Sequence, residues 1–371
     1  MRITAAVSRE SGTVPGLEQV DLGEPRPDEV LVRMVATGIC HTDINAHHGR
    51  GVPVPRPIVL GHEGAGVVEA VGAGVTRLVP GDHVVLSGNS CGVCPRCLDA
   101  RPTYCREAMR VAFGGARLDG SSPISRDGDR IAAMFFGQSS FATYALAPAR
   151  SAVLLPKDLP LHLMAPLGCG VITGAGSVLE SFRLRPGQSI AVFGTGGVGL
   201  AAVMAARLAG ARHIVAVDIN PSRLDLAREL GATDTVLGGS GAEQALRDID
   251  PEGFDFAYVT ADVPSVYATA TECLAVEGTL GYVVAPAGEW VPDTGFLLAG
   301  GRRLQGIIGG SANPHVLIPQ LVEYWRAGRF PFDRMIEEFP FSDFAQAWTE
   351  TRSGRVIKAV LRMPESDARD A

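Results

Sequence analysis

The chain has 371 residues, of which 46% are hydrophobic and 20% are charged, and 45 are glycine. This length is enough for two domains with cores of their own, and the composition is typical of soluble α/β enzymes. The net charge is −7 and no basic cluster is present, which argues against nucleic acid and anionic membranes as partners.

The first part of the chain predicts a β-rich domain. Apolar residues alternate with polar ones, with glycine and proline between the runs, in VLVRMVATGI, IVLGHEGAGVVEAVG and PGDHVVLS. This pattern predicts short strands in a compact, largely antiparallel domain over residues 1–165. The N-terminus, MRITAAVSRESG, has no apolar signal core, so we expect a cytoplasmic protein.

Within this domain, the stretch CGVCPRCLDARPTYC places Cys91, Cys94, Cys97 and Cys105 close together. Four thiolates at this spacing can surround one zinc ion as a tetrahedron. Such a site has no open position for a substrate, so we expect a structural zinc. In a cytoplasmic chain, the seven cysteines are better interpreted as metal ligands and core residues than as disulfides.

The middle of the chain, residues 166–305, predicts a parallel sheet with helices on both faces. SIAVFGTGGVGL gives a strand, a glycine turn and the start of a helix, and HIVAVD gives a second strand ending in Asp218. The glycines Gly194, Gly196, Gly197 and Gly199 would let the backbone approach a pyrophosphate at the helix N-terminus. Asp218 would accept hydrogen bonds from the adenosine ribose and would repel a 2′-phosphate, which favours NAD over NADP. The alternative is a structural glycine turn followed by an incidental acid.

Residues 306–371 predict a helix, PHVLIPQLVEYWRAG, and a strand, RVIKAVLRM, that return to the first domain. The final PESDARDA is expected to be a frayed tail. No internal repeat is visible.

Three isolated residues stand beside glycine or after an apolar run: Cys40 in ATGICHTD, His62 in LGHEGAG and Cys169 in APLGCG. Two thiolates and one imidazole form a zinc site with an open fourth position, which is the ligand set that alcohol dehydrogenase exemplifies. Each residue by itself is better explained as buried packing. Their joint presence with the four-cysteine cluster and the dinucleotide motif supports the metal site.

These motifs together resemble the zinc-dependent medium-chain alcohol dehydrogenases over nearly the whole chain. GHEGAGVVEAVGAGV is similar to the zinc signature of that family, and CGVCPRC with Cys105 is similar to its structural zinc lobe. FFGQSSFATYAL and APLGCGVITGAG most resemble the benzyl (aryl) and geraniol alcohol dehydrogenases. The resemblance implies an α/β fold with a GroES-like β-rich catalytic domain and a doubly wound parallel-sheet Rossmann domain that binds NAD.

The resemblance also implies roles for individual residues. Cys40, His62 and Cys169 would bind the catalytic zinc, with Glu63 beside the metal, Asp43 orienting His62 and Thr42 bonding the substrate oxygen. The cofactor contacts would be His41 and Lys358 at the pyrophosphate, Thr173 and Val198 at the nicotinamide, and Arg223 at the ribose. The implied reaction is the reversible oxidation of a primary, aromatic or allylic alcohol to an aldehyde, by hydride transfer from a zinc-bound alkoxide to NAD.

Other functions share part of this pattern. The aldehyde-reducing direction uses the same residues, and a thiol-adduct formaldehyde dehydrogenase would share both zinc sites. A non-catalytic nucleotide-binding relative would be expected to have lost a ligand or the glycine turn, and this chain keeps both. The segment LDGSSPISRDGDRI resembles a longer loop of dimeric members, which favours a homo-oligomer and, among oligomers, a dimer.

The sequence leaves two features of the proposed catalytic site open. Proton exit is the first, because the family often has a histidine five residues after the first zinc cysteine and this chain has Asn45. Either solvent takes the proton, or His47 or His48 does; otherwise these histidines are exposed loop residues.

Cys273 is interpreted as a buried apolar residue.

The second open feature is the substrate pocket. Phe135, Phe136 and Phe141 are placed near the channel by the resemblance, and the small Ser87 and Gly88 would leave room for a ring or prenyl chain. The alternative is that these phenylalanines fill the core of the β-rich domain.

Overall fold

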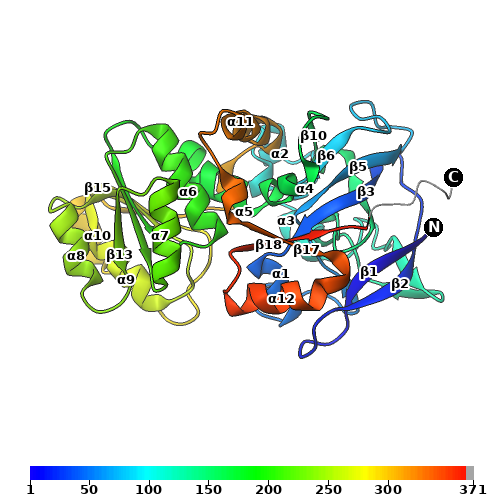
Figure 1. The fold of residues 1–371 in the computed structure, drawn as a ribbon, viewed down its shortest axis with the longest axis horizontal. Coiled ribbons are helices and arrows are strands. Elements are labelled where there is room, and N and C mark those ends of the chain that lie inside the picture. The colour runs from blue at the N-terminus through cyan, green and yellow to red at the C-terminus, as the bar shows by residue number, and fades with distance from the viewer. Residues whose placement is uncertain (365–371) are drawn as a thin grey trace. The chain divides into compact units, whose positions relative to one another are not determined.

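A computed structural model describes residues 1–364, and the chain forms two compact units (Figure 1). The first unit comprises Met1–Cys169, Asn313–Pro319 and the chain from Asp333 onward, and the second comprises Gly170–Ala312 and Gln320–Phe332. The proposed division at residues 165 and 305 differs from these limits mainly in Gln320–Phe332, which belongs to the second unit. This difference arises because one helix, α11 (Pro314–Arg326), begins in the first unit and ends in the second.

The first unit contains two β-sheets, with strand orders β4-β1-β2-β7-β8 and β10-β6-β5-β3-β18-β17, and β9 also pairs with β3. The strands are β1 (Arg2–Ser8), β2 (Gly16–Leu22), β3 (Glu29–Gly38), β4 (Ile58–Val59), β5 (Gly64–Val71), β6 (His83–Leu86), β7 (Ile124–Arg126), β8 (Asp129–Ile131), β9 (Tyr144–Pro148), β10 (Ala152–Leu155), β17 (Ile336–Pro340) and β18 (Lys358–Arg362). All pairs except β17 with β18 are antiparallel. In Figure 1 the red β18 runs beside the blue β3, which joins the last strand to an early one.

Strand β3 shows why this unit has a continuous core. Its sequence EVLVRMVATG is buried or partly buried along its whole length, and β5, β9 and β18 pair with it. Strand β2, GLEQVDL, instead alternates polar exposed and apolar buried residues, as expected for a sheet with one solvated face. The helices of the unit are short: α1 (His41–His47), α2 (Pro95–Leu98), α3 (Ala108–Phe113), α4 (Leu161–Met164) and α12 (Phe344–Ser353). Phe344 and Trp348 of α12 pack against Phe141, so this helix covers the core.

The second unit is a parallel sheet with helices, in the order β13-β12-β11-β14-β15-β16. Its strands are β11 (Ser189–Phe193), β12 (His213–Asp218), β13 (Asp234–Leu237), β14 (Phe254–Val259), β15 (Leu274–Tyr282) and β16 (Arg303–Gly306). Its helices are α5 (Gly170–Gly176), α6 (Gly197–Ala209), α7 (Pro221–Leu230), α8 (Ala242–Ile249), α9 (Pro264–Glu272) and α10 (Thr294–Gly300), and α6 and α7 are visible beside the sheet in Figure 1. The order changes direction at β11, and ligands of such sheets bind beyond the carboxyl ends of the strands at that point.

The ends of the helices follow from local sequence. Helix α7 begins after Asn220, whose side chain accepts a hydrogen bond from the Ser222 amide, and Pro221 occupies its first turn. The segment VYATATECLAVEG favours a helix from its sequence, but α9 ends at Glu272: Cys273 follows the helix and Leu274 begins β15. The predicted α/β fold class, with a β-rich and a parallel-sheet part, is confirmed.

Two further expectations concern the ends of the chain and the membrane. Of the predicted tail PESDARDA, residues 365–371 lie outside the described part. In residues 1–364, no single helix is long and apolar enough to cross a membrane, and one consecutive pair, broken at Cys169, reaches the required length only when its two members are added together.

Candidate zinc and dinucleotide sites

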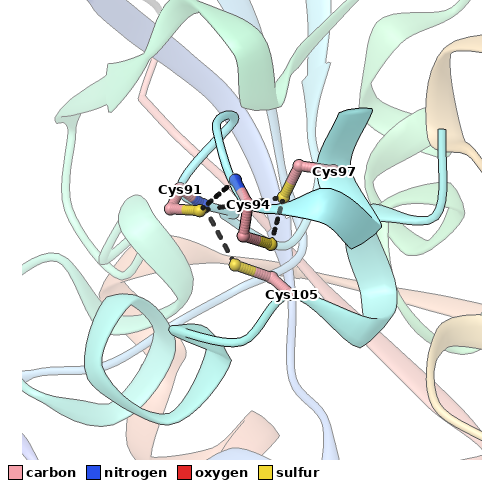
Figure 2. A group of neighbouring side chains, drawn as sticks. All are labelled: Cys91, Cys94, Cys97 and Cys105. Carbon is pink, nitrogen blue, oxygen red and sulfur yellow. Dashed lines mark hydrogen bonds between the residues drawn. The ribbon is translucent and has the colours of Figure 1, made fainter. Parts of the chain in front are cut away.

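The four clustered cysteines converge on one point (Figure 2). The Sγ atoms of Cys94 and Cys97 are 3.6 Å apart, and those of Cys91 and Cys97 are 3.9 Å apart. A tetrahedron with metal–sulfur bonds of about 2.3 Å has edges of about 3.8 Å, so the spacing fits zinc. The local fold produces this spacing, because Cys94 precedes α2 and Cys97 lies one turn later in it.

Backbone amides around this cluster suit it to thiolates. The Cys94 amide donates to Cys91 Sγ at 3.3 Å, and the amides of Cys91 and Glu107 donate to Cys105 Sγ. Hydrogen bonds from the backbone of Arg106 and Cys97 lower the pKa of Cys94 to about 6, whereas burial raises the pKa of Cys105 to about 12. Four sulfur ligands complete a tetrahedron and leave no position for a substrate.

A second group, Cys40, His62, Glu63 and Cys169, is assembled from three separate segments of the first unit. Cys40 lies between β3 and α1, His62 and Glu63 precede β5, and Cys169 follows a short turn at residues 165–168. The potential ligand atoms of the four residues all lie within 4.8 Å of one another, and His62 Nε2 is 3.2 Å from Cys169 Sγ. Two sulfurs and one nitrogen form an incomplete tetrahedron, so the donor set fits a zinc ion that keeps an open position.

Asp43 fixes the orientation of the His62 ring. It is fully buried, and its Oδ1 accepts from His62 Nδ1 at 2.9 Å and from the Gly61 amide at 3.0 Å. Its Oδ2 accepts from the Cys40 amide at 3.0 Å. Because Nδ1 carries the proton given to Asp43, Nε2 is left to bind a metal. The orienting role assigned to Asp43 thus agrees with its contacts.

The group is strongly polarised. The hydrogen bond from Cys169 lowers the pKa of Cys40 well below its usual range, with smaller help from His62 and Lys358. The same hydrogen bond raises the pKa of Cys169 well above its usual range, and burial and the charge of Cys40 add to that rise. Burial alone would lower the pKa of His62, but Asp43 and Cys40 together raise it. A bound metal cation would displace protons from the thiol and imidazole groups that bind it.

Glu63 forms a buried ion pair with Lys358. Lys358 Nζ lies 2.8 Å from both carboxylate oxygens of Glu63, and it also donates to the Ile39 carbonyl at 3.3 Å. Burial raises the pKa of Glu63, and the charge of Lys358 opposes that rise. Burial lowers the pKa of Lys358, but Glu63 and Cys40 raise it by more, so it lies above its usual value. The sequence reasoning assigned Lys358 to a pyrophosphate and did not predict this pairing. No local signal could have found it, because the two residues are 295 positions apart.

The other polar residues of α1, and His48 directly after it, differ in exposure and in their hydrogen-bond partners. Thr42 Oγ1 lies 3.7 Å from Cys40 Sγ, and His41 is exposed. Neither His47 nor His48 is an exposed loop residue: His47 is only 1% exposed and ends α1, and His48 caps it. His47 Nδ1 is bonded to Ser8 Oγ at 2.9 Å, and His48 Nδ1 lies 2.8 Å from the Ser11 carbonyl.

The three phenylalanines near the proposed pocket do not share one environment. Phe135 and Phe141 are completely buried in the core, so the core alternative is confirmed for these two. Phe136 is half-buried and stacks on the His62 ring at 4.6 Å between centroids. The Ser87–Gly88 segment lies beside Phe136 and the loop before Cys169: a Cβ on Gly88 would lie 3.7 Å from Phe136, and Ser87 Oγ donates to the Gly168 carbonyl.

The glycine turn of the second unit has the geometry of a phosphate cradle. Gly194 has φ +93°, and a Cβ there would lie 2.5 Å from Thr260 Oγ1. A Cβ on Gly199 would lie 1.8 Å from the Gly194 carbonyl oxygen, so the turn requires glycine at both positions. A Cβ on Gly196 would meet nothing within 4 Å, which leaves the backbone open to a ligand at the start of α6. Gly197, the first residue of α6, completes the glycine set.

Asp218, at the carboxyl end of β12, faces this turn. The amide and hydroxyl of Thr195 both donate to its Oδ2 at 2.7 Å, and the Asn220 amide donates to Oδ1 at 2.9 Å. Oδ1 therefore keeps accepting capacity for a ribose hydroxyl. Arg223 lies one turn into α7.

Thr173 and Val198 are brought together by glycine packing. A Cβ on Gly174 would lie 2.0 Å from the Val198 carbonyl oxygen, so α5 approaches α6 closely at this point. His41 and Lys358 belong to the first unit, while Thr173, Val198, Asp218 and Arg223 belong to the second.

Comparison with known proteins extends over the same regions. Residues 26–157 match the family described as the alcohol dehydrogenase GroES-like domain, and residues 197–323 match the zinc-binding dehydrogenase family. The chain is 44% identical to geraniol dehydrogenase of Castellaniella defragrans over 362 residues, with 96% of each chain covered. The chain belongs to the zinc-dependent alcohol dehydrogenases.

Solved structures of this alcohol dehydrogenase family agree with that assignment. An alcohol dehydrogenase zinc-binding domain protein from Burkholderia ambifaria matches with a TM-score of 0.96 and 46% identity, covering 98% of this chain and 100% of that one. Benzyl alcohol dehydrogenase from Acinetobacter calcoaceticus matches with a TM-score of 0.94 and 38% identity, at the same coverage. The resemblance, the enzyme class and the assignment of zinc with a nicotinamide cofactor are thereby confirmed, and the alternative of a non-catalytic relative is not retained.

Proposed function

We propose that this alcohol dehydrogenase oxidises primary alcohols with an sp² carbon next to the carbinol carbon, such as benzylic or allylic alcohols. The observation that carries this proposal is the half-buried Phe136 ring stacked on His62, with the small Ser87 and Gly88 beside it. A flat apolar group could pack on the ring where larger residues would fill the space. Geraniol and benzyl alcohol dehydrogenases among the relatives support the same substrate class.

In this proposal, Cys40, His62 and Cys169 would hold the catalytic zinc, and Cys91, Cys94, Cys97 and Cys105 would hold the structural one. A bound catalytic zinc would supply a positive charge that lowers the pKa of an alcohol hydroxyl. Thr42, at the start of α1, accepts the hydroxyl proton and passes it outward. Asp43 keeps the His62 ring in the tautomer that presents Nε2. Thr173 and Val198 would contact the nicotinamide of a bound cofactor, which would supply the hydride acceptor.

Cofactor choice is proposed to follow from Asp218. Its carboxylate is only 8% exposed and is held by three hydrogen bonds from Thr195 and Asn220, so it cannot turn away from a 2′-phosphate. Loss of ribose hydrogen bonds and like-charge contact cost several kcal/mol together, which predicts a preference for NAD of roughly a hundredfold or more in kcat/KM. Comparable kcat/KM values for NAD and NADP in the wild-type enzyme would contradict this choice.

The substrate proposal is tested with benzyl alcohol, geraniol, cyclohexylmethanol and ethanol under one set of conditions. Burial of about 100 Å² more apolar substrate at ~25 cal/mol/Å² gives roughly 2.5 kcal/mol, or nearly a hundredfold in kcat/KM over ethanol. If ethanol equals the bulky alcohols, the pocket argument fails. If cyclohexylmethanol matches benzyl alcohol, size matters and unsaturation does not.

The same assay addresses the other proposals that the sequence leaves open. Formaldehyde with a thiol tests the thiol-adduct alternative, and aldehydes with NADH test the reducing direction. A homo-oligomer, with a dimer favoured, and a cytoplasmic location are also proposed. Light scattering after gel filtration and cell fractionation test these two.

A further inference from the structure

Gln138 is a buried amide that contacts three backbone groups near the open zinc site. Its side chain is 2% exposed. Its Nε2 donates to the His62 carbonyl at 3.1 Å and to the Ser87 carbonyl at 3.5 Å, and its Oε1 accepts from the Gly64 amide at 3.1 Å. The amide thus bonds to the backbone on both sides of Glu63.

The surrounding turn fixes the direction of this side chain. Phe136, Gly137 and Ser139 all have positive φ, between 51° and 75°. Ser139 holds the turn in place, because its Oγ donates to the Val59 carbonyl at 2.6 Å and accepts from the Phe135 amide at 3.0 Å. Backbone in this region is costly for residues other than glycine and persists only where neighbouring bonds impose it.

The opposite strand is shaped to receive the amide. A Cβ on Gly64 would lie 3.0 Å from Gln138 Oε1 and 2.5 Å from the Met34 side chain. Glycine at this position therefore lets the Gln138 carbonyl oxygen reach the Gly64 amide.

Gln138 is connected to the Cys169 loop through hydrogen bonds of Ser87. The Ser87 carbonyl accepts from Gln138, and the Ser87 hydroxyl donates to the carbonyl of Gly168, the residue before Cys169. Phe136, two residues before Gln138, stacks on the His62 ring itself. One side chain is thus hydrogen-bonded to the His62 loop and to the strand end that contacts the Cys169 loop.

We propose that Gln138 is a positioning residue of the open zinc site, one that sets the backbone angle of His62 and Glu63 and links it to the Cys169 loop. The inference rests on the proposed function for its kinetic consequences, although the metal geometry can be measured without them. Groups that orient metal ligands affect metal affinity or activity about tenfold to hundredfold when they are removed.

The test uses the full-length holoenzyme and its cobalt-substituted form. Gln138→Met keeps the length of the side chain and removes all three hydrogen bonds. Gln138→Glu keeps an acceptor for the Gly64 amide but turns an oxygen toward the His62 and Ser87 carbonyls. We expect kcat to fall tenfold to hundredfold in both variants with the KM for NAD unchanged. We also expect the cobalt absorption bands of the open site to shift, with the four-cysteine site contributing equally to all spectra.

Ser140→Ala is the matched control. Ser140 lies in the same turn and is fully buried, and its hydroxyl bonds only to Thr37 Oγ1 among the bonds described for it, at 2.8 Å. It should lower the melting temperature while leaving kcat and the cobalt bands as in the wild type.

The outcomes separate a positioning role from a structural one. If Gln138→Met lowers only the melting temperature and keeps wild-type cobalt bands and kcat, the inference is wrong. If Gln138→Met does not fold, an unaltered spectrum and kcat in Gln138→Glu overturn it equally. A wild-type enzyme without dehydrogenase activity would contradict the proposed function instead, and the cobalt spectra would still decide the role of Gln138.

Discussion

The proposed closed site would take its four ligands from residues 91–105, whereas the proposed open site would take its ligands from positions 40, 62 and 169. Around the closed site, backbone amides are the donors, and neighbouring side chains such as Val93 and Leu98 are about three-quarters exposed, at 76% and 75%. Around the open site, buried side chains of Asp43, Glu63 and Lys358 provide the partners.

This difference separates two uses of the same metal. A site that needs only short chain segments and amide donors can be formed locally, and its metal closes a loop. A site that must leave one position open is held by charged groups far apart in the sequence, so its geometry depends on the whole fold of the first unit. Changes at the two sites should therefore have separable effects.

The largest effect is expected at Cys169. Cys169→Ala removes one of three ligands of the open site and should abolish turnover, while the protein stays folded and retains about one zinc, in the closed site. Metal analysis and an NADH absorbance assay measure this. Cys273→Ala is the control, because Cys273 is buried in the second-unit core and belongs to neither metal group. Two zinc ions per chain in Cys169→Ala would contradict the ligand assignment.

The reverse effect is expected at Cys97. Cys97→Ala opens the closed site, and structural zinc binds with apparent free energies of about 10–16 kcal/mol in small peptides, so a loss of several kcal/mol in stability is reasonable. Turnover at low temperature should remain within several-fold of the wild type. Thermal melts with and without a chelator measure the first quantity. A Cys97→Ala enzyme with wild-type stability would contradict the structural role proposed for the zinc of the closed site.

The same contrast explains how much the sequence could predict. The closed site was predictable because Cys91, Cys94 and Cys97 lie within two turns of chain, and spacing alone determines their approach. Cys40, His62 and Cys169 were indicated by residue type and by the glycines beside them, but no periodicity connects them, and only the resemblance to a family joined them into one site. The parallel sheet and its turn were predictable because Gly194 and Gly199 obey steric rules that act over a few residues.

Contacts that depend on tertiary packing were not predicted. The Lys358–Glu63 pair and the amide of Gln138 involve partners brought together by the sheets, and nothing near either residue in the sequence signals them. For Phe135, Phe136 and Phe141, the sequence predicted only part of what the structure shows. A local cluster of aromatic residues predicts burial, but not that Phe136, with left-handed backbone at φ 51°, stacks on the His62 ring while Phe135 meets that ring edge-on.

A smaller effect is expected at Asp43, where only the support of a ligand changes. Asp43→Asn replaces one of the two accepting oxygens by an NH₂ group, so either the Cys40 amide or both the Gly61 amide and His62 Nδ1 lose their acceptor. We expect zinc affinity at the open site to fall about tenfold to hundredfold, with the closed site unaffected. Competition with a chromogenic chelator resolves the two affinities. Asp82→Asn, a carboxylate that accepts from the Val79 amide outside both metal groups, is the control.

The smallest effect is expected at His47, which lies in the helix that follows Cys40. Burial lowers the pKa of His47 from 6.5 to about 4, with further repulsion from His48 and Arg56 and a weaker effect from Arg352, while a Thr13 backbone hydrogen bond opposes the change. Because the folded state prefers the neutral ring, its contribution to stability is complete above about pH 6.5 and is lost as the pH falls toward 4. Wild-type protein should therefore lose about 1–3 kcal/mol more than His47→Gln over this range. Denaturant titrations at several pH values measure the difference.

His47→Gln also decides the route of the proton. Nδ1 of His47 is bonded to Ser8, and its ring packs edge-on against His48 and Trp348, so the side chain is committed within the core. The dependence of kcat on pH should therefore be the same in His47→Gln and in the wild type, with solvent taking the proton from the Thr42 side. His213→Gln, a partly exposed histidine of the second unit, controls for the loss of any imidazole. A kinetic pKa that disappears in His47→Gln alone would instead place this ring in the relay, and would mean that the buried surroundings of the open site conduct protons as well as hold its ligands.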